Sequence, residues 1–193
     1  SENLDSWVKM PTPSAGLFLE NVAFEHKGCH FVSADFISRE AGHESCDIHN
    51  VEGGSWPWLL ADIAAASVGP KERINVFTHH GMFRTSIPSI DNLLISESDM
   101  DTIIEGLCPY RDYIATSYGG HVHQNWPWET PCKTGEVIYQ VWMTDDAFDA
   151  VISPETSDDR VTIRVVSVTP TDDSFAYEQT LLVEPVSHTE RID

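Results

Sequence analysis

Histidines occur at the ends of two apolar segments of this chain, where they could bind metal ions. The segment INVFTHHGMF contains His79 and His80, and IATSYGGHVHQN contains His121 and His123 behind two glycines. Neutral imidazole is the commonest nitrogen ligand of zinc, iron, manganese and nickel in proteins. In extended backbone, residues i and i+2 point the same way about 7 Å apart, which suits two ions about 3.5–4 Å apart. The alternative is that His121 and His123 are turn residues that bind only backbone groups.

The other histidines form no second complete set. The segments HKGCH and HESCDIH have spacings that a metal ion could use, but no further ligands complete either of them. We therefore interpret these as loop histidines.

Three short apolar runs predict strands that position the histidine segments. Residues 29–36 (CHFVSADF) form an apolar run of strand length, and residues 74–79 lead directly into the first histidine pair. Residues 112–121 are a third such run, which ends in Gly-Gly-His. Each candidate ligand thus follows a predicted strand.

Two helices are predicted between these strands. Residues 55–67 (SWPWLLADIAAAS) have helical apolar spacing, with Ser55 as a candidate N-cap and Pro57 in the first turn. Residues 99–108 have a similar pattern behind Ser98, which we expect to be the N-cap of the second helix.

The alternation of strands and helices predicts an α/β fold in which helices flank a mixed sheet. Ligands of such sheets bind beyond the carboxyl ends of the strands, so His79, His121 and His123 should converge there. Residues 160–168 and 175–183 alternate apolar and polar positions and predict an antiparallel C-terminal hairpin, with Val165 on its apolar face. With 193 residues, we expect residues 1–193 to form a single domain.

The composition excludes several classes of partner. The formal net charge of −20 argues against nucleic acid, because nothing would offset repulsion by the phosphates. No apolar run approaches the roughly 20 residues that cross a bilayer, so no membrane partner is expected. The chain begins SEN without an apolar signal core, which indicates either a removed leader or a fragment.

Four cysteines indicate an oxidising compartment. We expect Cys29 to pair with Cys46 and Cys108 with Cys132, since each pair brackets a short excursion near the end of an element. An extracytoplasmic or secreted location follows from this interpretation. Buried free thiols in a cytosolic protein are the alternative.

The two histidine segments together resemble the C-terminal half of the calcineurin-like metallophosphoesterase superfamily, which includes purple acid phosphatases and cyclic nucleotide phosphodiesterases. The resemblance extends over about residues 20 to 145. It implies half of a β-sandwich flanked by helices, a phosphate-ester substrate, and two divalent or trivalent metal ions (zinc, iron, manganese or nickel). By the same motif, His79 and His121 would share one ion and His123 would bind the other. The resemblance leaves two interpretations of His80, which would either contact a phosphate oxygen as a catalytic residue or be a polar neighbour of a ligand.

The upstream motifs of that superfamily are absent. Its Asp-x-His, Gly-Asp and Asn-His segments have no counterpart here, and His43, Asp47 and His49 occur in the wrong order and after the strand they should precede. We therefore expect a companion polypeptide that carries the N-terminal half of the fold, or a second copy of this chain. The function is then a metal-dependent phosphoesterase that is complete only with the companion. The alternative is a non-catalytic, metallophosphoesterase-like binding or assembly subunit.

Overall fold

A computed structural model describes residues 6–9, 21–37, 46–49, 54–84, 95–121, 127–143 and 160–185. For residues 6–9, 160–164 and 181–185 it describes the backbone alone. His123 and His43 lie outside these ranges.

The central layer is a seven-stranded mixed sheet. In spatial order its strands are β1 (Ser6–Lys9), β2 (Val22–His26), β3 (Cys29–Ala34), β4 (Ile74–His80), β5 (Ile114–Gly120), β7 (Val137–Met143) and β6 (Pro127–Pro131). Neighbours from β3 to β7 are parallel, whereas β2 runs antiparallel to both β1 and β3, and β6 runs antiparallel to β7. The predicted α/β fold with a mixed sheet is confirmed.

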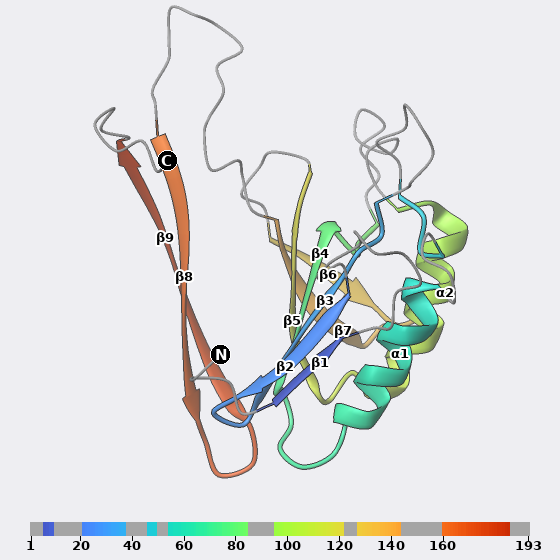
Figure 1. Ribbon diagram of the computed structural model, residues 1–193, viewed down its shortest axis with the longest axis horizontal. Helices are drawn as coiled ribbons and strands as arrows, with labels where there is room; N and C mark the ends of the chain where they lie inside the picture. Colours follow the sequence, from blue (N-terminus) through green and yellow to red (C-terminus); the bar gives the residue numbers. More distant parts are fainter. Residues whose placement is uncertain are drawn as a thin grey trace, which may run out of the picture.

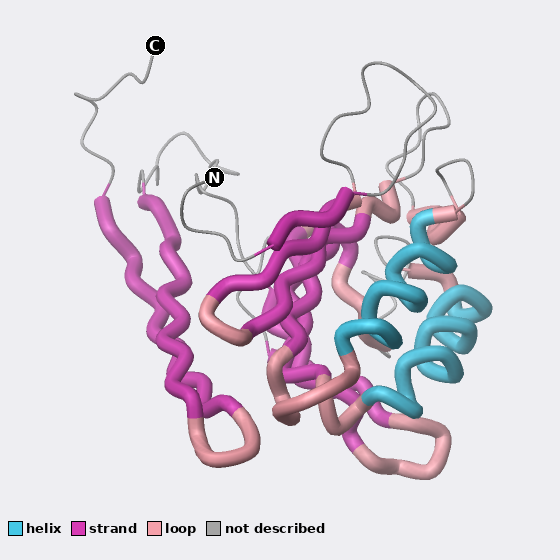
Figure 2. Tube along the Cα trace, turned by 60° about the horizontal axis from the view of Figure 1, so that its bottom comes forward, coloured by secondary structure: helices cyan, strands magenta, loops and turns pink. Residues whose placement is uncertain are grey.

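Two helices cover one face of this sheet (Figure 1). Helix α1 (Ser55–Ala66) buries Leu59 and Ile63, and helix α2 (Glu97–Leu107) buries Ile103 and Leu107. These side chains join the apolar core formed with Val32 and Val76 of the sheet; Figure 2 shows both helices on the same side. Burial of this shared core holds the four parallel strands in place.

The helix starts differ from the prediction. The N-cap of α2 is Ser96, whose hydroxyl accepts a hydrogen bond of 3.1 Å from the amide of Asp99, so the prediction of Ser98 was wrong. Helix α1 follows Gly54 without a side-chain cap, and the hydroxyl of Ser55 instead accepts a bond from the amide of Asn21. Serine is a favoured N-cap residue, so residue type alone does not show which of several nearby residues caps a helix. The packing of the helix decides this.

The opposite face of the sheet carries the C-terminal hairpin, formed by β8 (Arg160–Pro170) and β9 (Phe175–Pro185) (Figure 1). The hydroxyl of Tyr177 donates to the carbonyl of Glu72 at 2.8 Å and accepts from the side-chain amide of Asn75 at 3.2 Å. The predicted hairpin is confirmed, but its apolar face is not the expected one. Val165 is 43% exposed, and its half-buried neighbour Val166 faces the sheet.

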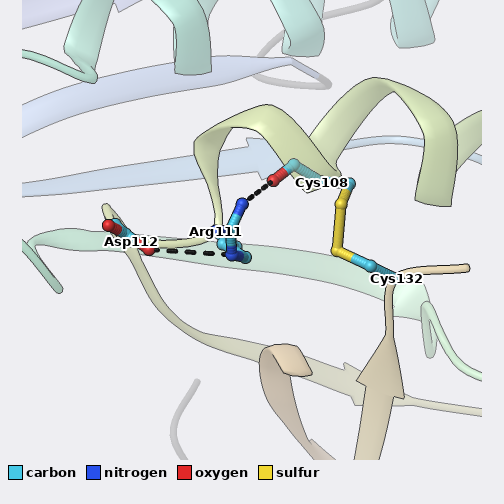
Figure 3. Close-up of a disulfide and its surroundings, with 4 residues drawn as sticks. All are labelled: Cys108, Arg111, Asp112 and Cys132. Carbon is cyan, nitrogen blue, oxygen red and sulfur yellow. Dashed lines mark hydrogen bonds and ion pairs between the residues drawn. A yellow bond between two sulfur atoms is a disulfide. The ribbon is translucent and has the colours of Figure 1, made fainter. Parts of the chain in front are cut away.

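One of the two predicted disulfides is present. Cys108, at the end of α2, is bonded to Cys132, directly after β6, with 5.6 Å between their Cα atoms (Figure 3). Arg111 donates to the carbonyl of Cys108 and lies beside Asp112, which secures the same turn. The bond therefore ties the second helix to the far edge of the sheet.

The predicted bond between Cys29 and Cys46 was wrong, because both are free thiols. Cys29 begins β3, whereas Cys46 pairs with Ile37 beyond the other end of that strand. Eight residues of extended chain separate the two ends by roughly 26 Å, far beyond the reach of a disulfide. Within the described ranges, no helix is long and apolar enough to cross a membrane.

Candidate functional site

His79 and His121 lie side by side at the carboxyl ends of β4 and β5, as expected. The Nε2 atom of His79 is 2.9 Å from the Nδ1 atom of His121, and their ring centroids are 4.9 Å apart. His79 is exposed to solvent, and His121 is partly buried. His123 lies outside the described residues, and its predicted convergence with the pair stays a prediction.

The backbone of His121 differs from the extended form expected from the sequence. Its φ angle is 71°, in the left-handed region, and it forms a bend directly after β5. That conformation is uncommon for residues with a side chain, although histidine is among those that tolerate it. It costs of order 1 kcal/mol or more and tends to occur at functional sites. The argument that His121 and His123 point the same way along a strand was therefore wrong in its premise.

Two glycines allow the ends of β4 and β5 to approach each other. A Cβ atom added to Gly119 would lie 2.8 Å from the Cα atom of Gly81, which is closer than real Cβ contacts. Any larger residue at position 119 would push the strand ends apart. Gly81 and Gly119 thus set the distance between the two histidines.

The backbone after β4 is held by two hydrogen bonds from side chains of β6 and β7. The carbonyl of Met82 accepts hydrogen bonds from the hydroxyls of Thr130, at 2.8 Å, and Tyr139, at 3.1 Å, both buried. These bonds hold the segment that directly follows His80. No motif in the sequence indicates this role, because the bonds join residues about 50 positions apart.

His80 lies behind the histidine pair. Its side chain is buried with 1% exposure, and its ring centroid lies 4.3 Å from that of His121 and 5.1 Å from that of His79. Its backbone carbonyl accepts a bond of 2.6 Å from the hydroxyl of Thr78. This position suits packing against the ligands better than contact with a phosphate oxygen.

The donor geometry of the histidine pair fits a shared metal ion in part. Two ligands of a tetrahedral zinc ion, each about 2.05 Å from the metal, lie about 3.3 Å apart. The 2.9 Å between His79 Nε2 and His121 Nδ1 would have to open by only a few tenths of an ångström. Among the residues that the structure describes, however, no group of three His, Cys, Asp or Glu side chains is arranged to hold a metal ion. Within the described part of the chain, the pair thus offers two candidate ligand nitrogens.

Another histidine, His30, lies in a cluster of charged side chains on the face of the sheet that the helices cover. Its Nδ1 atom is 2.8 Å from Glu25 and its Nε2 atom is 2.6 Å from Asp62 of α1, while Arg73 also binds Glu25. Burial alone would lower the pKa of His30, but the hydrogen bonds and charges of Asp62 and Glu25 outweigh it and the pKa is raised. The interpretation of His30 as a loop residue was wrong, because it belongs to β3 and binds α1 to the sheet.

Comparison with protein-family models gave no match to this chain, and comparison with curated protein sequences gave none either. The resemblance to metallophosphoesterases therefore stays a prediction that rests on the two histidine segments and their order.

Proposed function

We propose that the protein is a metal-dependent phosphoesterase to which this chain supplies the C-terminal histidine ligands. The observation that supports it is the contact of 2.9 Å between ring nitrogens of His79 and His121, which come from separate strand ends. Imidazole nitrogens directed at one point from two parallel strands form the beginning of a metal site. In this proposal the pair shares one ion and His123 binds a second.

The proposed reaction is hydrolysis of a phosphate ester. The water oxygen bonds to phosphorus, the bond from phosphorus to the ester oxygen breaks, and the leaving alcohol takes a proton from water. Two metal ions lower the pKa of the attacking water and stabilise charge on the phosphoryl oxygens when they are bound. His79 and His121 would hold one ion through their ring nitrogens, and buried His80 packs against the His121 ring, with 4.3 Å between the two ring centroids.

The remaining ligands are carboxylates in this proposal, and a companion polypeptide provides them. No described Asp or Glu joins the histidine pair in a group of metal-binding arrangement, which supports the need for a companion. A second copy of this chain is the other possible source. The Cys108–Cys132 disulfide supports an extracytoplasmic or secreted location, where such bonds persist.

A non-catalytic binding or assembly subunit is the second candidate. It is favoured by the same lack of a third ligand among the described side chains. In that case His79 and His121 would keep their hydrogen bond and bind no ion.

The experiment compares the chain alone with the chain mixed with a polypeptide that carries Asp-x-His and Asn-His motifs. Bound metal is measured by elemental mass spectrometry, and hydrolysis is measured with 4-nitrophenyl phosphate and bis(4-nitrophenyl) phosphate. We expect weak metal binding alone, and tight binding with hydrolysis in the mixture. A chain that binds no metal and hydrolyses neither ester in both preparations would establish the non-catalytic alternative.

A further inference from the structure

A large cleft lies between the sheet and the C-terminal hairpin, next to the histidine pair. Its volume is about 860 Å³, within the range of small-molecule sites in proteins. Phe31, Phe77 and Tyr118 line it from the sheet, and Val166 and Val168 line it from the hairpin. The hydrogen bonds of Tyr177 to the sheet hold these two walls together.

The sheet wall of the cleft presents stacked aromatic rings. Phe77 and Tyr118 lie on adjacent strands with ring centroids 5.0 Å apart and an angle of 19° between their planes. Phe77 remains 37% exposed, although most large apolar side chains of the described chain are buried. An exposed ring that is already stacked on its other side can receive a further aromatic ring.

The described lining of the cleft differs in charge from the protein as a whole. The chain has 31 acidic residues and a formal charge of −20, yet no Asp or Glu occurs among the described residues that line the cleft. Its ionisable lining includes Lys27, His26 and His79 instead. An anionic ligand is therefore repelled by most of the surface and least by this cleft.

His79 belongs both to the cleft lining and to the proposed metal site. A ligand that lies along the cleft with its anionic end at His79 would place that end at the metal. The opposite end of the ligand would then contact Phe77 and Tyr118.

We propose that the cleft binds the aromatic leaving group of the phosphate ester, so that the substrates are aryl phosphates. This inference rests on the proposed function for the place of the phosphate, and on the cleft itself for the aromatic part. The ring of the substrate stacks on Phe77, and the phosphate lies at His79 and His121.

The test measures binding of two phosphonates that cannot be hydrolysed at a P–O ester bond. Phenylphosphonate and methylphosphonate are titrated into the full chain by calorimetry, with and without zinc. We expect phenylphosphonate to bind roughly tenfold more tightly, the scale that burial and stacking of one ring supports. Phe77→Ala should abolish this preference.

A second variant guards against loss of folding in the first. Val166→Trp fills the cleft from the hairpin wall and should also abolish the preference for phenylphosphonate. Val68→Ala is the matched control, because Val68 is 66% exposed and does not line the cleft. Circular dichroism verifies that each variant is folded.

Equal binding of the two phosphonates, no measurable binding of phenylphosphonate, or an unchanged preference in both cleft variants would overturn the inference. Failure of the proposed function is recognised separately. In that case the chain shows no metal binding or hydrolysis with its companion, while the preference for the aryl probe persists and depends on Phe77.

Discussion

The Nε2 atom of His79 lies 2.9 Å from the Nδ1 atom of His121, although 42 positions separate the two residues in the chain. Each ring directs a nitrogen at the other. A cation bound by both nitrogens would take the place of the proton that they share. Helix α2 lies between the two residues in sequence and packs on the face of the sheet opposite the C-terminal hairpin. The fold thus brings two histidines together from the ends of adjacent strands.

Removal of either histidine of the pair should weaken metal binding. We expect His79→Ala and His121→Ala each to reduce zinc affinity by at least about tenfold, because one of few ligands is lost. Isothermal titration with zinc measures this. His49→Ala is the control, since His49 is also exposed but lies outside the pair, and its affinity should equal that of the wild type. Equal affinities in all variants would contradict the site.

Substitution of Gly119 should disturb the pair without removing a ligand. In Gly119→Ala the new Cβ would collide with the Cα atom of Gly81 at 2.8 Å, so the ends of β4 and β5 must separate. We expect a loss of about 1–3 kcal/mol of stability, typical of overpacking, and weaker zinc binding. Urea denaturation and zinc titration measure the two effects.

Gly69→Ala is the control for a glycine-to-alanine change without a collision. Unlike Gly119, Gly69 has a positive φ angle, of 89°, and no atom lies within 4 Å of an added Cβ. This control should lose some stability and keep its zinc affinity. Unchanged zinc affinity in Gly119→Ala would show that the spacing of the strand ends does not position the histidines.

The parallel core was predictable from sequence because its signals are local. The apolar runs that became β4 and β5 end at histidine and glycine, and their parallel pairing follows from the helix between them. Three strands with antiparallel neighbours, β1, β2 and β6, were not predicted. Strand β6 begins and ends with proline, which argues against a strand except at a sheet edge, where β6 lies.

Other predictions were wrong because the sequence pattern was compatible with more than one arrangement. The turn between β2 and β3 consists of Lys27 and Gly28, both with positive φ, and a Lys-Gly pair is a weaker signal for this turn than Asn-Gly. Val165 and Val166 are adjacent, so alternation alone could not decide which one faces the sheet. The predicted pairing of Cys29 with Cys46 was wrong because their distance in the sequence does not show that they lie at opposite ends of a strand.

Loss of the Cys108–Cys132 disulfide should destabilise the fold. The bond closes a loop with a sequence separation of 24, for which the chain-entropy relation gives about 3.4 kcal/mol. We expect the double variant Cys108→Ser/Cys132→Ser to melt roughly 10 °C lower than the wild type. Differential scanning calorimetry measures the change.

The two free thiols provide the control for that experiment. Burial, with the charge of Asp99 and other nearby carboxylates, raises the pKa of Cys46 to about 12, so its thiol stays protonated and unreactive. Cys46→Ser should respond to a reductant as the wild type does, whereas the double variant should not respond. A melting temperature of the wild type that is unaffected by reductant would contradict the structural role of the bond.

The His30 cluster should make the free energy of unfolding decrease as the pH rises through the raised pKa of His30. Both ring nitrogens of His30 contact carboxylates, at 2.8 Å from Glu25 and 2.6 Å from Asp62, and only the protonated ring can donate both bonds. The pKa is raised above its usual 6.5, so the stabilisation is fully present below about pH 6.5 and is lost as the pH rises through the raised pKa.

We expect His30→Gln to cost about 3 kcal/mol near pH 6, because it leaves the largely buried carboxylate of Asp62 without its cationic partner. The difference between wild type and variant should shrink by pH 9, where the wild-type ring is neutral. Urea denaturation at several pH values measures this difference, which cancels the titration of groups shared by both proteins. Asp62→Asn is the matched variant, since it removes one carboxylate that raises the pKa and should move the transition to lower pH. A constant difference from pH 6 to pH 9 would contradict this prediction, because it would mean that His30 does not titrate in the folded protein over that range.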